Sequence, residues 1–366
     1  MSKSALLNNK GFLAKIVFVS LFVAMTIFSV ACAPEQKETE KPKEEPKETK
    51  PSKKAFPKSI DADFPTDLIF TDDKLFMTEK GGKLKVLNRG ENEPKTLLTV
   101  QVPQIMGYNE TGLLGIALSP NFDNNQQIYL FHTLRVDSEL KNRVIRVEAD
   151  NPEKKPVVII DDIEGGRIHD GGKMAFGPNG NLFIATGDAD KQQLSQNKNS
   201  LNGKILRIKP DGSIPADNPF NNATWSFGHR NIFGMTFDNK GRLFVTENGP
   251  ESNDEINEIK KGANYGWPNT TGDDPDFEKP LITFQASIAP TGIIFYTGNK
   301  INEVKNRLVF GDFVNGDVHK LTLQDSTATD KIIASSQGDI NTVAQTEDGF
   351  IYLGVRDKIK QLELTD

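Results

Sequence analysis

The sequence contains one cysteine, Cys32, so no intrachain disulfide can stabilise the fold and a hydrophobic core must do so. The net charge is −6 and no basic face stands out, which argues against nucleic acid as a partner. The four histidines do not cluster at metal-ligand spacing, so no zinc site is predicted. No G-x-S-x-G, Walker or G-x-G-x-x-G motif lies between a strand and a helix. Serine hydrolases, nucleotide hydrolases and Rossmann dehydrogenases therefore lack support.

An uncharged apolar run occupies residues 16–31, follows the basic residues Lys3 and Lys10, and ends in "SVAC". This pattern predicts a lipoprotein signal peptide over residues 1–32, cleaved before Cys32, with lipid on the Cys32 sulfur. An uncleaved membrane anchor is the alternative, but the run is shorter than the roughly 20 residues that a membrane span needs. Either interpretation places the rest of the chain outside the cytoplasm, in the cell envelope or periplasm.

Residues 33–58 mix Lys, Glu, Pro and Thr with almost no apolar side chains. Such a segment cannot bury enough surface to offset its chain entropy. We therefore predict a disordered tether between the lipid anchor and a globular domain over residues 59–366.

One pattern recurs through that domain: a polar turn followed by a short run of alternating apolar residues. It appears at residues 72–80, 124–133, 178–188, 239–249, 304–313 and 347–357. Each occurrence predicts a strand, and a period of roughly 40–65 residues is typical of propeller blades. No long amphipathic helix is evident. We predict an all-β fold, a six-bladed β-propeller of four-stranded antiparallel blades, with a β-sandwich array as the alternative. Loops at the mouth of the central channel are the expected place for a site.

Three groups of residues could carry chemistry at such loops. His169 and His229 each follow or adjoin glycine just before a strand, although a polar turn residue is the simpler interpretation of either. Arg230 and Asn231 could bind an anionic, carbonyl-rich ligand, or could form an interblade salt bridge. The acidic stretch around residues 251–255 could bind a hard cation such as calcium, or could be a solvated loop.

Six motifs in order give the chain a specific resemblance. They are "ETGLLGIALSPNF" (110–122), "HDGGKMAFGPNGNLFIATGD" (169–188), "NGKILRIKPDGSIPADNPF" (202–220), "GHRNIFGMTFDNKGRLFVTENGP" (228–250), "DEINEIKKGANYGWP" (254–268) and "SIAPTGIIFYTG" (287–298). Together they resemble the soluble glucose and aldose sugar dehydrogenases, six-bladed propellers that use pyrroloquinoline quinone (PQQ) and calcium. The resemblance covers about residues 60–320.

The resemblance implies a role for each matching residue. His169 corresponds to the general base that takes the proton of the sugar C1 hydroxyl while hydride passes to PQQ. Arg230 and Asn231 correspond to the pair that holds the PQQ oxygens, and Asp170, beside His169, is expected at the cofactor as well. Backbone carbonyls of Gly249 and Pro250 correspond to ligands of the calcium next to PQQ.

Glu255 and Tyr265 correspond to ligands of a second, structural calcium. An aldose or related alcohol is the implied substrate, with an external electron acceptor.

The later part of the chain departs from this family. The family supplies a lysine and an "R-x-R-D" segment to the cofactor, whereas no arginine lies here between Arg307 and Arg356. Lys320 is a cation of this region that could compensate for the missing arginines. A non-enzymatic envelope lipoprotein that binds a glycan or protein partner is therefore the alternative function. A lactone or glycoside hydrolase is a third hypothesis, for which the sequence offers no identifiable water-activating group.

Overall fold

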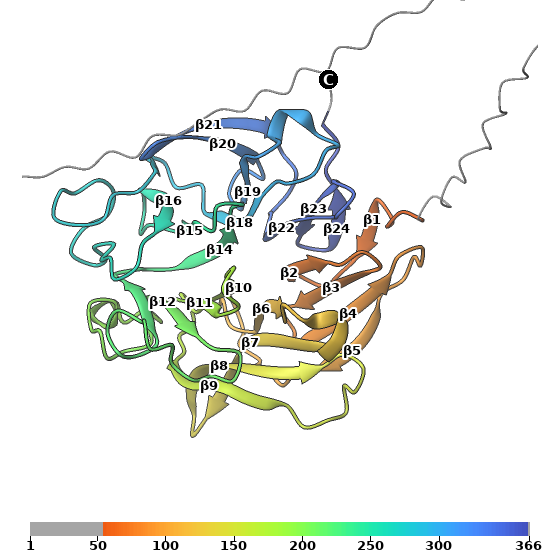
Figure 1. Ribbon diagram of the computed structural model, residues 1–366, viewed down its shortest axis with the longest axis horizontal. Helices are drawn as coiled ribbons and strands as arrows, with labels where there is room; N and C mark the ends of the chain where they lie inside the picture. Colours follow the sequence, from red (N-terminus) through yellow and green to blue (C-terminus); the bar gives the residue numbers. More distant parts are fainter. Residues whose placement is uncertain (1–53, 365–366) are drawn as a thin grey trace, which may run out of the picture. The chain divides into compact units, whose positions relative to one another are not determined.

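The structure is a computed structural model that describes residues 54–364. These residues form six four-stranded antiparallel sheets, which follow one another around a ring (Figure 1). This arrangement confirms the predicted six-bladed β-propeller of four-stranded antiparallel blades. The signal peptide, Cys32 and most of the predicted tether lie outside the described residues. No described helix is long and apolar enough to span a bilayer.

The strands are assigned to blades in chain order. Blade 1 holds β2 (Pro65–Phe70), β3 (Lys74–Glu79), β4 (Lys83–Asn88) and β5 (Lys95–Thr99). Blade 2 holds β6 (Leu113–Leu118), β7 (Gln127–Val136), β8 (Glu139–Glu148) and β9 (Val157–Glu164). Blade 3 holds β10 (Gly171–Phe176), β11 (Leu182–Thr186), β12 (Lys204–Ile208) and β13 (Thr224–Phe227).

Blade 4 holds β14 (Ile232–Phe237), β15 (Leu243–Glu247), β16 (Asp254–Ile259) and β17 (Ile282–Phe284). Blade 5 holds β18 (Pro290–Phe295), β19 (Leu308–Asp312), β20 (Val318–Gln324) and β21 (Thr327–Ala334). Blade 6 holds β22 (Thr342–Gln345), β23 (Ile351–Val355), β24 (Lys358–Gln361) and β1 (Ser59–Asp61). The described helices are single turns: α1 (Phe122–Asn125), η1 (Gln192–Leu194) and η2 (Asn302–Val304).

The recurring sequence pattern marks the second strand of every blade. Five of these strands are almost completely buried, and β7 is buried except near its ends, because each is flanked by two strands and covered on both faces by neighbouring blades. Six hydrophobic clusters fill the six seams between blades, one cluster to each seam. Face-to-face packing of sheets, rather than one central core, therefore stabilises the ring.

The ring closes through β1, which pairs with β24 so that the first strand of the domain completes the last blade. Ile60 of β1 is 1% exposed and belongs to the cluster between blades 6 and 1. Phe56, placed in the tether by the sequence, is also buried and packs edge-on against Phe70. The propeller therefore begins at least as early as Phe56, and the predicted boundary after residue 58 is too late.

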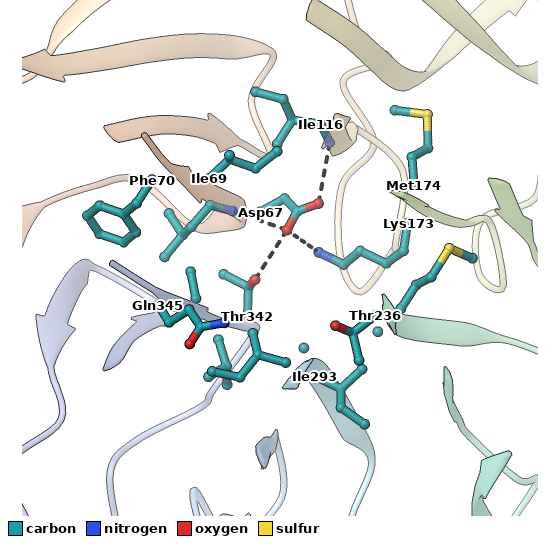
Figure 2. A pocket seen from close by; sticks show the side chains of 17 residues that line it. Asp67, Ile69, Phe70, Ile116, Lys173, Met174, Thr236, Ile293, Thr342 and Gln345 are labelled. Carbon is teal, nitrogen blue, oxygen red and sulfur yellow. Dashed lines mark hydrogen bonds and ion pairs between the residues drawn. The ribbon is translucent and has the colours of Figure 1, made fainter. Parts of the chain in front are cut away.

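A buried ion pair crosses the central channel (Figure 2). Lys173 of β10 lies 3.3 Å from the Asp67 carboxylate of β2 and donates a hydrogen bond to the Thr66 carbonyl. Asp67 also accepts hydrogen bonds from the Ile116 amide and the Thr342 hydroxyl, so four blades meet at this carboxylate. Burial lowers the pKa of Lys173, and Asp67 opposes that shift. Lys173 lines a pocket on each side of this pair, so the pair divides the channel.

Candidate functional site

A pocket of about 280 Å³ opens at one end of the channel, and all six blades contribute to its lining. Part of the lining comes from the inner strands themselves, and the rest lies mostly just before the inner strand or just after the second strand of a blade. Glu110 and Asn341 represent the first position, and Lys80, Asn248 and Arg356 represent the second. The chain therefore brings residues as far apart in sequence as Lys80 and Arg356 to one mouth by repeating the same blade geometry.

His169 does not itself line this pocket, but its amide is bonded to Glu110, which does, and its ring is held by Asp188. The Nδ1 atom of His169 lies 2.8 Å from Oδ1 of Asp188, a fully buried carboxylate at the end of β11. The second oxygen of Asp188 accepts the indole N–H of Trp267 at 2.8 Å. A carboxylate at Nδ1 favours the tautomer with the proton on Nδ1, which leaves Nε2 as a proton acceptor. Among the described residues, none forms a hydrogen bond with Nε2 of His169.

The backbone around His169 is unusual. His169 has a φ of 63°, a conformation that non-glycine residues rarely adopt. A Cβ atom on Gly187 would lie 1.9 Å from the His169 carbonyl oxygen, so the two loops approach this closely only because residue 187 is glycine. The "TGD" segment therefore both supplies Asp188 and makes room for the histidine loop.

Glu110 joins His169 to Asn231. One oxygen of the Glu110 carboxylate accepts the His169 amide N–H at 2.7 Å and the Asn231 side-chain amide at 2.9 Å. Its other oxygen accepts the Tyr108 hydroxyl at 3.0 Å. Glu110 itself lines the pocket, so His169 and Asn231 are fixed to the pocket wall through a shared acid.

Arg230 lies beside the same wall. Its guanidinium donates to the Asn248 carbonyl at 3.0 Å and lies 5.4 Å from the centre of the Trp267 ring. Nε of Arg230, Oδ1 of Asn231 and Oδ1 of Asn248 are buried and have no hydrogen-bond partner. Unpartnered buried polar atoms are uncommon in folded proteins. Three of them close together therefore indicate a site that binds a polar ligand. Arg230 forms no salt bridge among the described residues, which does not support the salt-bridge alternative.

Asp170 and His229, two other residues proposed from the sequence, form hydrogen bonds within the fold. The Asp170 carboxylate is 1% exposed and accepts hydrogen bonds from the Gly166 amide, Asn142 and Thr133. Burial raises the pKa of Asp170 to about 7. These contacts join the loop before β10 to blade 2, and Asp170 does not line the pocket. His229 is fully buried, stacked on Tyr265 and bonded to Glu247 and Ser226.

The loop at residues 248–254 is ordered by Asp254. One oxygen of this buried carboxylate accepts the Gly249 amide, and the other accepts the amides of Ile288 and Ala289. The loop therefore holds Gly249 and Pro250 next to Asn248, whose side-chain oxygen lacks a donor. Glu251 is exposed.

Glu255 and Glu247 are paired across β15 and β16 and share a hydrogen bond donor, Asn257. Burial raises the pKa of Glu255, and the neighbouring Glu247 carboxylate raises it further. The Tyr265 hydroxyl donates to the Glu258 carbonyl and accepts the Lys260 amide. No group of three His, Cys, Asp or Glu side chains within residues 54–364 is placed to hold a metal ion. A cation at Gly249 and Pro250 would therefore depend on backbone or amide oxygens, and one at Glu255 and Tyr265 on the Glu255 carboxylate together with backbone oxygens.

Sequence reasoning did not single out Glu110, Asp188, Trp267, Lys80 or Arg356. The sequence did contain a signal for Asp188. It is the last residue of the repeated strand pattern at 178–188, and Asn248 lies near the end of the same pattern in blade 4. Glu110 had none, since a single acid before a strand is common. Lys320, considered as a replacement cation, is paired with Glu303 at 2.9 Å and does not line the pocket.

Known proteins resemble this chain along most of the propeller. Residues 62–362 match the family model described as glucose/sorbosone dehydrogenase. Quinoprotein glucose dehydrogenase B of Acinetobacter calcoaceticus is 33% identical over 303 residues, covering 72% of this chain and 61% of that protein. Aldose sugar dehydrogenase YliI of Escherichia coli is 28% identical over 324 residues, covering 80% of this chain and 86% of that protein.

A solved structure supports the same assignment. The PQQ-bound form of aldose sugar dehydrogenase from Streptomyces coelicolor has a TM-score of 0.73 and 29% identity, and the match covers 86% of this chain and 96% of that one. The six blades, the sequence matches and the family model agree, and the chain belongs to the glucose/sorbosone dehydrogenase family of oxidoreductases.

Proposed function

We propose that this protein oxidises the C1 hydroxyl of an aldose sugar or a related alcohol with transfer of hydride to PQQ, and that His169 is the general base. The observation that carries the proposal is the His169–Asp188 pair, which is joined to the pocket through Glu110. Asp188 orients the ring and stabilises the imidazolium that forms when Nε2 accepts a proton. The three unpartnered polar atoms of Arg230, Asn231 and Asn248 lie on the adjoining wall.

PQQ fits the donors and acceptors of this wall. Its quinone accepts the two electrons of the oxidation, and its carboxylates need cationic or N–H partners. Arg230 and Asn231 are the residues that would hold its oxygens, and the Trp267 ring backs the arginine. Asp170 is less suited to contact the cofactor, because the fold uses its carboxylate.

Calcium is part of the proposal at two places. The carbonyls of Gly249 and Pro250, with the unpartnered Oδ1 of Asn248, offer oxygen ligands of the kind that calcium prefers. A cation there would act as a Lewis acid toward a neighbouring carbonyl. The second place is Glu255 with the Tyr265 carbonyl, where a cation would offset the repulsion between buried Glu247 and Glu255.

The location and the anchor remain proposals from the sequence. We propose that Cys32 is lipidated and that the enzyme acts outside the cytoplasm, passing electrons to an external acceptor. Mass spectrometry of the Cys32 peptide from the membrane fraction tests the anchor, and an unmodified, uncleaved N-terminus contradicts it.

The activity test uses the full chain with PQQ, calcium, a panel of sugars and a dye acceptor. We expect dye reduction with at least one aldose. His169→Ala should abolish turnover while calorimetry still detects PQQ binding. His132→Ala is the matched control, because His132 is a buried histidine of β7 that lines a different pocket and not this one.

Two outcomes contradict the proposal in different ways. No dye reduction together with no PQQ binding favours a non-enzymatic envelope lipoprotein. A His169→Ala variant that loses PQQ instead of turnover contradicts the role of His169 as base.

A further inference from the structure

The pocket at the channel mouth has more cations than acids. Its lining includes Lys80, Lys173 and Arg356 but one carboxylate, that of Glu110. Arg230 adds a fourth cation beside the wall through its bond to Asn248. A pocket with this balance favours an anionic ligand.

The three cations of the lining differ in how they are paired. Lys173 forms an ion pair with Asp67. Arg356 donates through Nε and Nη2 to Asp339, and its side chain is 68% exposed. Lys80 has no carboxylate within 4 Å among the described residues, although it is half-buried.

Two neighbours hold Lys80 in place. Its ammonium donates to the Asn109 carbonyl and lies 5.0 Å from the centre of the Phe64 ring. Burial lowers its pKa, while the Glu110 charge opposes that shift. A lysine kept partly out of water without a carboxylate partner is costly for the fold, unless a ligand supplies the counter-charge.

Blade geometry directs Lys80 to the site. It is the first residue after β3, and Asn248 is the first residue after β15, so the two hold equivalent positions in blades 1 and 4. Asp188 holds nearly the same position in blade 3, two residues after β11. In blade 6, which packs against blade 1, Asn341 adds a buried side-chain N–H that lacks an acceptor.

We propose that Lys80, assisted by Asn341, binds a carboxylate of the quinone cofactor, and so supplies from blade 1 a cation that is not already paired with a carboxylate, as Arg356 of blade 6 is. The inference rests on the proposed function, since PQQ carries three carboxylates and Arg230 lies on the opposite wall. Lys80 acts in binding the cofactor and takes no part in moving the substrate proton.

The test is calorimetric titration of the full chain with PQQ in the presence of calcium. A charged hydrogen bond is worth about 1.5–3 kcal/mol, so Lys80→Met should weaken PQQ binding by about 10- to 100-fold. Lys80→Arg should remain within a few-fold of wild type. Lys83→Met is the control, because Lys83 is an exposed lysine on the next strand of the same blade.

A second titration uses the trimethyl ester of PQQ, which lacks the negative charges. Wild type and Lys80→Met should bind this ester equally. Binding of PQQ should also weaken with added salt more steeply in wild type than in Lys80→Met. Thermal melting of each variant without PQQ verifies that the fold is intact.

The outcomes separate the two proposals. If wild type does not bind PQQ, the proposed function fails. If wild type binds PQQ and Lys80→Met binds as tightly as Lys83→Met, the function stands and the role of Lys80 is refuted. A large loss in Arg356→Met with none in Lys80→Met likewise refutes it and assigns the charge to blade 6.

Discussion

His319 should make the stability of the propeller depend on pH above neutrality. It lies in β20 of blade 5, 3% exposed, with its ring stacked on Phe310. Nε2 is 3.0 Å from the Asp312 carboxylate and Nδ1 is 2.9 Å from that of Asp330. Both ring nitrogens therefore face acceptors, and both can donate only when the imidazole is protonated.

The size of the effect follows from the pKa. Burial alone would lower the pKa of His319, but the hydrogen bonds to Asp312 and Asp330 outweigh it and raise the pKa to about 9 from 6.5. Each unit of this shift corresponds to 1.36 kcal/mol, so the protonated histidine stabilises the fold by about 3 kcal/mol. This contribution is complete below pH 6.5, the unfolded value, and is lost as the pH rises through about 9.

The assay is urea unfolding of wild type and His319→Gln at pH 6, 8 and 10. The difference in free energy of unfolding between the two should shrink by about 3 kcal/mol across this range. His132→Gln is the comparison variant, because burial lowers the pKa of His132 to about 4, so this ring is neutral in the folded state from pH 6 to 10 and causes no loss of stability as the pH rises. A constant difference between wild type and His319→Gln from pH 6 to 10 would refute the reasoning.

Three further results are expected. Asp188→Asn should lose most of the 10²- to 10⁴-fold that a positioned base contributes to turnover, with PQQ affinity retained; stopped-flow dye reduction at saturating PQQ measures this. Asp67→Ala should lower the free energy of unfolding by about 3–5 kcal/mol, because Lys173 is left buried without its partner, and Asp67→Ala combined with Lys173→Met should recover part of that loss in urea melts. Calcium at a hundred times its dissociation constant should raise the free energy of unfolding by about 2.7 kcal/mol, and Glu255→Gln should reduce this gain; denaturation with and without a chelator measures both.

The fold could be predicted because its signal is repeated. Each blade needs a fully buried second strand entered from a tight turn, and six copies of that pattern survive in the sequence. Residues 54–58 were misassigned for the converse reason: Phe56 is one apolar side chain in a charged stretch, and its burial depends on Phe70 and Tyr352, which lie elsewhere in the sequence. No local pattern reports such a contact.

The sequence predicted only those site residues that lie in recognisable motifs. His169, Arg230 and Asn231 were found through their resemblance to a family, and the structure places all three beside one pocket wall. Their partners depend on pairs of loops that meet in space: Glu110 is 59 positions from His169, and Trp267 is 79 from Asp188. The sequence shows neither distance, so the roles of these partners could not be inferred from it.

The pairing of β1 with β24 has a consequence for biosynthesis. The first strand of the domain is made early, but its partner is among the last segments to be translated. Until then Ile60 and Phe56 have no finished seam to enter, and the inner faces of blades 6 and 1 stay uncovered. A chain that stops short of β24 cannot close, and it exposes unpaired strand edges and apolar surface of the kind that promotes aggregation. Closure of the seam between blades 6 and 1 thus requires β24, so only molecules that contain this strand reach the closed form.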